Sequence, residues 1–388
     1  MSAAAARRRK QLLARKKSQE EAANNLDPVS ARLQSLLQDE DLKEESIAYE
    51  ALQLAQSQVR KKVHAGEFSA AVDLAYSCSL TILKRSRVSV ASQLLAVLVS
   101  VLRETHTEET DEIIQKIVEL NQAHQEAMKD WTGEEANRLQ RLQRDWLRRV
   151  VQWSSELGKI RFGHFVLQEL LAQHCWNLSK IVVGSAKDTE EEDEIMELKT
   201  EAITHMALAE QPDRIVEWLK ELPAPTDAEM ATGHTCPPAD RDALLTRAVL
   251  CLCAVENLRD ANTLVRAFLE KVEDRKADEL TKSYTAKDDG KAPSHVIFCC
   301  MLLRICEKDP RTGPLFSWLL RSFKKELDAL YKAQIVQGYT TKIGKIYFNI
   351  QPPPSMLNML ENMMGHGGPA GVGGMNPAML QAMMGGMQ

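Results

Sequence analysis

The sequence of 388 residues is poor in aromatic residues and, before its C-terminal end, in glycine. Phenylalanine, tyrosine and tryptophan make up only 5% of it, and eight of the 18 glycines lie between Gly365 and Gly386. Because strands favour aromatic and β-branched residues, this composition argues against a β-sandwich or barrel. Since 44% of the residues are hydrophobic and 27% are charged, most of the chain is expected to fold, and to fold into helices.

Long apolar runs and a secretory leader are also lacking. No run reaches the roughly 18 to 20 apolar residues that a membrane-spanning helix needs, so we expect no membrane anchor. Most of the eight cysteines lie in apolar helical stretches, where a free cysteine behaves as a small hydrophobe. This pattern predicts a protein of the reducing cytosol without disulfides. The net charge of −5 gives no general reason to expect nucleic-acid binding.

Motifs for catalysis, metals and cofactors are missing as well. The chain has no Gly-x-x-x-x-Gly-Lys phosphate loop, no His-Glu-x-x-His and no Cys-x-x-Cys pair. His174 and Cys175 are adjacent, but on a helix they point about 100° apart. No third group is evident to complete a catalytic set with them. We therefore expect a protein that is not an enzyme and that carries no metal ion and no cofactor.

What the chain contains is helical periodicity, from Asp27 to about Ile335. Asp27 is a suitable N-cap and Pro28 suits a first helical position. Apolar residues then recur three and four positions apart, as they do on one face of a helix. This pattern is clearest at Ala91, Leu94, Leu95, Leu98, Val101 and Leu102, and at Phe316, Leu319, Leu320, Phe323, Leu327 and Leu330.

Two helix starts also resemble each other. Phe68-x-x-Ala71 and Leu258-x-x-Ala261 each follow a short polar turn. Small alanines at these positions let neighbouring helices approach closely, as in repeats of helix pairs. The fold class predicted is therefore all-α, built of stacked, tetratricopeptide-like helix pairs. One stretch, Ile343–Ile350, is β-branched and aromatic, and we expect it to be either part of a short β-hairpin or the end of a helix.

Composition divides the chain into five segments. Residues 1–26 form a basic arm that is expected to be disordered, with a transit peptide or a nuclear-import signal as alternatives. Two helical halves, 27–182 and 201–351, are separated by an acidic loop at 183–200. Residues 352–388 form a flexible tail rich in methionine and glycine.

The tail is the most unusual of these segments. Methionine is flexible and polarizable, so methionine-lined surfaces accept varied apolar partners. The run that begins at Asn376-Pro377 presents Met379, Leu380 and Met383, which are candidates for contact with a hydrophobic client or a chaperone. The alternative is a low-complexity tail that makes no selected contact.

Several blocks of the sequence resemble one family. They are Tyr49-Glu50-Ala51-x-Gln53 with Lys61 and Leu74-x-Tyr76-Ser77, Trp153-Ser154 with Phe162-Gly163, Glu201-Ala202-x-x-His205-Met206, and Ile343-Gly344-x-x-Tyr347-Phe348-Asn349-Ile350. They are similar to the Golgi-to-ER traffic protein four family, which serves the guided entry of tail-anchored proteins. The resemblance spans about Leu33 to Met364, with gaps.

The resemblance implies a right-handed α-solenoid that works as a cytosolic adaptor without catalytic residues. In the family the N-terminal helices contact a targeting ATPase, and the C-terminal half grips a ubiquitin-like-domain protein or, in animals, a large scaffold protein. Contact with the tail-anchored client is indirect.

Residue by residue, the resemblance marks two sets of candidates. Tyr49, Gln53 and Lys61 are candidates for the ATPase contact, although Tyr49 is equally suited to the core. The candidates for the partner groove are Leu319, Leu320, Phe323 and Leu327, which are at least as well suited to core packing, with Tyr347 and Phe348 as candidates that support the groove. Gln56 stands where family members often carry a basic residue, which places the details of the ATPase interface in doubt.

Two alternatives stay open. One is a generic helical-repeat subunit of another large cytosolic complex. The other is a chaperone that binds hydrophobic segments directly through the methionine-rich tail.

Overall fold

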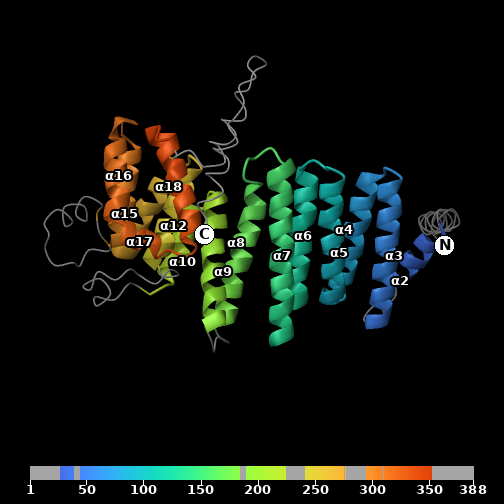
Figure 1. The fold of residues 1–388 in the computed structure, drawn as a ribbon. Helices are drawn as coiled ribbons and strands as arrows, with labels where there is room; N and C mark the ends of the chain where they lie inside the picture. The colour runs from blue at the N-terminus through green and yellow to red at the C-terminus, as the bar shows by residue number, and fades with distance from the viewer. Residues whose placement is uncertain are drawn as a thin grey trace, which may run out of the picture.

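The computed structural model describes residues 27–38, 44–183, 189–223, 241–274, 276, 294–308 and 310–351. All regular structure in these ranges is helical, and the helices stand side by side in an elongated row (Figure 1). The all-α solenoid predicted from the sequence is therefore confirmed. The basic arm, the tail candidates Met379, Leu380 and Met383, and most of the proline-rich and charged loops lie outside the described residues.

The first half of the row is a regular double layer. Helices α3, α5 and α7 lie side by side in one layer, and α4, α6 and α8 lie in the other. The bounds are α2 Pro28–Gln38, α3 Glu45–His64, α4 Phe68–Lys84, α5 Val88–Glu104, α6 Asp111–Met128, α7 Glu134–Leu157, α8 Phe165–Val183 and α9 Thr189–Leu208. Helices α2, α4 and α13 begin at Pro28, Phe68 and Leu258, as predicted.

One kind of turn recurs between these helices. At Gly66, Ser86 and His106 the backbone takes a left-handed conformation, with φ of 77°, 59° and 49°. In each case the next N–H bonds a carbonyl five residues back, as Arg87 N does to Ile82 O at 3.2 Å. This is the Schellman closure, which satisfies the last carbonyls of a helix. The same closure recurs in the second half at Glu210 and Glu256.

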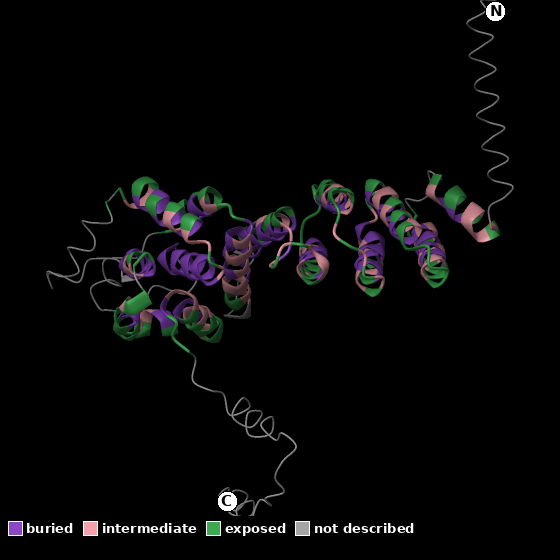
Figure 2. Cartoon of the chain, turned by 90° about the horizontal axis from the view of Figure 1, so that it is seen from above, coloured by how far each residue is buried: buried purple, intermediate pink, exposed green. Residues whose placement is uncertain are grey.

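The second half is built around one enclosed helix. All 14 residues of α12, Arg241–Ala254, are buried, because α9, α10, α13, α15 and α18 surround it (Figure 2). The other bounds are α10 Pro212–Lys220, α13 Leu258–Phe268, a π-helical turn Leu269–Glu273, α15 Ser294–Cys306, a 3-10 turn Pro310–Thr312, α16 Gly313–Ser322, α17 Lys324–Asp328 and α18 Ala333–Phe348.

The hairpin alternative for Ile343–Ile350 is wrong. Helix α18 continues to Phe348, and Asn349 closes it in a left-handed conformation. The aromatic and β-branched residues serve helix packing: the rings of Phe316 and Phe348 stack with centroids 4.7 Å apart, and Ile343 is fully buried. Packing against neighbouring helices therefore overrides the β-propensity of this stretch.

The acidic segment also differs from the prediction. Helix α9 begins at Thr189, so most of the residues predicted as a loop are helical. Their carboxylates face arginines of α7, as with the bidentate bond between Arg141 and Glu194. Because these cations offset the repulsion among the acidic side chains, the run can form a packed helix.

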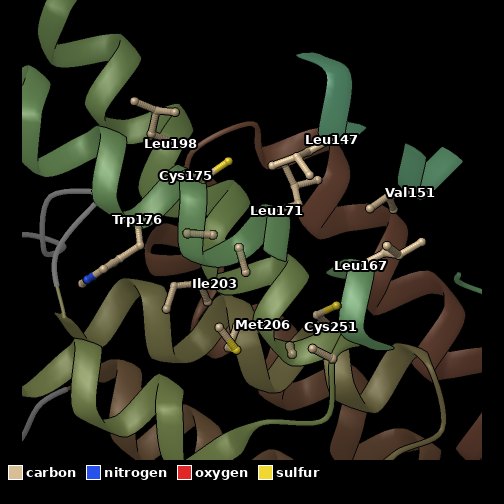
Figure 3. Packing of buried hydrophobic residues seen from close by; sticks show 14 of the residues in the cluster. Leu147, Val151, Leu167, Leu171, Cys175, Trp176, Leu198, Ile203, Met206 and Cys251 are labelled. Atoms are coloured by element: carbon tan, nitrogen blue, oxygen red, sulfur yellow. The ribbon is translucent and has the colours of Figure 1, made fainter. Parts of the chain in front are cut away.

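A continuous core links the two halves. Figure 3 shows how Leu147 and Val151 of α7 and Leu171 of α8 pack toward Met206 of α9 and Cys251 of α12. Trp176 of α8 stacks on Trp218 of α10, with centroids 4.7 Å apart. Cysteines in the described ranges are free and buried, as predicted.

Not every tryptophan serves that core. Trp131 is 39% exposed and Trp318 is 43% exposed. Trp131 follows the end of α6 and Trp318 lies on α16, and the described helices leave both side chains partly uncovered.

Candidate partner-binding surfaces

The N-terminal candidates lie on one helix but in different environments. Tyr49 is half-buried and packs against the core, whereas the side chains of Gln53 and Lys61 are exposed. The structure therefore does not gather the three residues into one pocket. It places them along α3, at the end of the row nearest the N-terminus (Figure 1).

Lys61 is held by a contact within the chain. Its Nζ lies 2.8 Å from Asp27 Oδ2, and Gln58 Nε2 donates to the same oxygen at 3.1 Å. The bond from Lys61, and after it that from Gln58, lower the pKa of Asp27 below its usual value. This exposed pair ties the start of α2 to the end of α3, and a partner must compete with Asp27 to engage Lys61.

Arg60 was missed by the sequence reasoning. It is exposed on α3, and no ion pair to it is found within the described ranges. Its guanidinium is therefore more available to an acidic partner than the ammonium of Lys61. The run Arg60-Lys61-Lys62 is the signal that was present in the sequence. Phe68, at the start of the next helix, adds an apolar side chain that is 43% exposed.

The C-terminal candidates are mostly core residues. Leu319, Phe323, Leu327 and Phe348 are buried where α16, α17 and α18 meet, with Leu319 fully enclosed. Leu320 and Tyr347 are half-buried and reach the surface only in part. Four of the six are therefore enclosed between these helices, and the other two are partly exposed.

An open groove does exist nearby, between α13 and α15. It has a volume of about 370 Å³ and an apolar floor. Charged residues of both signs surround it, which suits an amphipathic helix better than a small molecule. The floor is formed by Val265, Leu269, Cys300 and Leu303, and the rim by Arg266, Glu270, Lys276, Arg304 and Glu307.

A buried ionic cluster joins α7 to α9 between the two ends. Arg144 Nε and Nη2 donate to Glu201 Oε2 at 2.8 and 2.5 Å, and Arg148 also bonds Glu201. Arg144 and Glu201 are 9% and 10% exposed. Burial by itself would raise the pKa of Glu201, but the Arg148 bond and the Arg144 charge outweigh it and hold that pKa below its usual value.

Further contacts carry this cluster into the second half. Glu197 accepts from Arg144 and Arg148, and its carboxylate lies 3.7 Å from Lys332, at the start of α18. On α12, Arg247 Nη1 donates to the Tyr331 carbonyl at 2.8 Å. The orientation of one half relative to the other is thus fixed by charged groups as well as by the apolar core.

His174 and Cys175 are buried and have structural roles. Burial raises the pKa of Cys175 well above its usual value, so its thiol stays protonated near neutral pH. His174 Nε2 bonds the Gln140 carbonyl at 2.8 Å. In the described part of the chain, no group of acidic, histidine or cysteine side chains has the arrangement of a metal site. No described helix is long and apolar enough to cross a membrane.

Comparison with known proteins identifies the family. The model of the Golgi to ER traffic protein 4 family matches residues 65–366, which is most of the sequence. The chain belongs to the Golgi to ER traffic protein 4 family. Protein GET4 of Arabidopsis thaliana is 24% identical over 347 residues, covering 83% of this chain and 93% of that protein.

The fold agrees with a solved member of the family. The crystal structure of C. therm. Get4 covers 90% of this chain and 98% of its own, with a TM-score of 0.50 and 21% identity. Membership in the Golgi to ER traffic protein 4 family supports a role in the targeting of tail-anchored proteins, within a complex that includes partner proteins.

Proposed function

We propose that this chain is a non-catalytic adaptor that holds a targeting ATPase at one end and a ubiquitin-like-domain partner at the other. The observation that carries the proposal is the separation of the two surfaces along the row (Figure 1). The exposed cations of α3 lie near one end, and the groove between α13 and α15 lies near the other. Two partners can therefore bind at once without contact between their sites.

The ATPase contact is assigned to Gln53, Arg60 and Lys61. Two neighbouring cations that are both exposed suit an acidic patch, and such charges act mainly on the rate of association. Tyr49 supports this face from within, since it packs on the core. The assignment keeps the exposed candidates of the sequence analysis and adds Arg60 to them.

The partner contact is assigned to the groove between α13 and α15. Its apolar floor suits the apolar side of a helix, and Arg266, Arg304 and Glu307 can pair with charges beside that side. Among the six sequence candidates, Leu320 and Tyr347 are the ones that are partly exposed. The ionic cluster between α7 and α9 limits movement of one end relative to the other, so that a client-loaded co-chaperone is held near the ATPase.

Reversing the charge of Arg60 tests the ATPase contact. Arg60→Glu is expected to weaken binding of the purified ATPase by roughly five- to thirtyfold, mainly through slower association, because it places an anion against an acidic patch. The loss should shrink as salt is raised. Biolayer interferometry at two ionic strengths measures both effects.

Arg321→Glu is the matched control, since Arg321 is an exposed arginine near the opposite end of the row. It should leave ATPase binding unchanged. Equal affinities for wild type and Arg60→Glu would remove α3 from the ATPase interface. Failure of the wild-type chain to form a ternary complex with both purified partners on size-exclusion chromatography would contradict the adaptor role itself.

A further inference from the structure

The last helices of the row leave an apolar stripe uncovered. On α16, Leu315 is 53% exposed and Trp318 is 43% exposed. Three residues apart, the two side chains are neighbours on one side of the helix, and Ser322 continues that side. The buried Phe316 and Leu319 lie on the adjacent side, about 100° around the helix, and face the core. The apolar surface of α16 thus extends beyond the part that the core covers.

This is unusual for the end of a repeat protein. Stacked helices need a terminal unit with a polar outer side, since nothing packs beyond it. Helix α16 lies at the outer end of the row in Figure 1, yet its Leu315 and Trp318 are exposed. A covering segment is therefore expected.

The chain itself continues from a point close to the stripe. Ile350 Cδ1 lies 3.7 Å from where a Cβ would stand on Gly313, the first residue of α16. Leu315 and Trp318 follow Gly313 by two and five residues, about 3 and 8 Å along the helix. The described residues end at Gln351, beside this contact.

The sequence after Gln351 has a matching apolar pattern. Met356, Met359, Leu360 and Met363 recur at spacings of three and four, as on one side of a helix. From Gln351 to Met356 the chain can extend about 16 Å, enough to reach the stripe. Glu361 is the single charged residue between Pro352 and Met364, and α16 carries the exposed Arg321 beside the stripe.

We propose that residues 355–364 dock on the Leu315–Trp318 stripe and cap the helical row. Methionine suits this contact because its side chain adapts to an irregular apolar surface. The stripe is separate from the groove between α13 and α15, so the cap does not depend on the proposed adaptor role. The remaining tail, with Met379 and Leu380, is left outside the contact.

Hydroxyl-radical footprinting tests the cap, with the oxidation of each tryptophan measured by mass spectrometry. A chain that ends at Gln351 should show oxidation of Trp318 several-fold faster than the full chain. Trp131 is a built-in control, because it is similarly exposed and lies in the first half of the molecule. Its rate should not change.

Substitutions in the full chain separate a specific contact from an effect of truncation. Met359→Asp with Met363→Asp should raise the oxidation of Trp318 to the level of the shortened chain, whereas Asn358→Asp should not. Protection should be independent of protein concentration. Equal oxidation of Trp318 with and without the tail would overturn the proposal. Protection of Trp318 that disappears on dilution would also overturn the proposal, because it would show that a second copy of the chain covers the stripe.

Discussion

Replacing Glu201 with alanine is expected to lower the free energy of unfolding by about 3 to 5 kcal/mol, because it leaves the buried Arg144 without its main counter-charge and takes the same partner from the partly exposed Arg148. Glu201 is 10% exposed and accepts bonds from both arginines. Removing the carboxylate alone therefore lowers the free energy of unfolding by more than the intact ion pair contributes to it. Urea denaturation followed by circular dichroism measures the change.

Glu194→Ala is the matched control on the same helix. Glu194 makes an equally well-formed bidentate pair with Arg141, but that arginine is 44% exposed. Water can solvate the released guanidinium, so the loss should stay below about 1 kcal/mol. Similar losses of unfolding free energy in the two variants would show that burial of the cluster does not increase its effect on stability.

Acidification is expected to weaken the fold through buried neutral histidines. Burial lowers the pKa of His124 to about 3 and that of His295 to about 4, from an ordinary value near 6.5. Below pH 6.5 the unfolded chain takes up protons that the folded chain excludes, so stability falls as the pH falls. Between pH 7 and pH 5 each of these two histidines lowers the free energy of unfolding by about 2 kcal/mol.

A histidine variant isolates this effect from other titrations. In His124→Gln the loss of stability between pH 7 and pH 5 should be smaller than in wild type by about 2 kcal/mol, whatever the variant does at pH 7. His64→Gln, at an exposed site, should behave as wild type. Urea titrations at the two pH values give the comparison. An unchanged pH dependence in His124→Gln would mean that His124 can be protonated in the folded state.

Helix starts were predictable because their signals are local. Pro28 fits a first turn, and Asn257 caps α13 by accepting from the Asp260 N–H at 3.1 Å. The repeat was harder to recognise for an equally local reason. Its constant feature is a residue in the left-handed conformation at the end of a helix. Glycine is the residue type that normally indicates this conformation in a sequence. Only one of the five positions carries glycine; they are Gly66, Ser86, His106, Glu210 and Glu256.

The surfaces proposed for partner binding were not predictable because they depend on long-range packing. Periodicity finds the apolar side of α16 but cannot tell Leu319, which is fully buried, from Leu315, which is mostly exposed. The acidic segment 189–200 looked like a loop because its partner arginines lie some 50 residues earlier. Only the fold shows that Arg144 and Glu197 are neighbours, and that Lys61 is already engaged by Asp27.

The enclosure of α12 has a consequence for the order in which the protein is made. Helices α3 to α8 touch mainly neighbours that leave the ribosome shortly before or after them, so they can settle as synthesis proceeds. Helix α12 becomes fully buried only after α15 and α18, which follow it in the chain, have been synthesised. A chain released before Phe348 should therefore carry a finished first half and an exposed, aggregation-prone α12. Limited proteolysis of ribosome-bound chains of increasing length would locate this step.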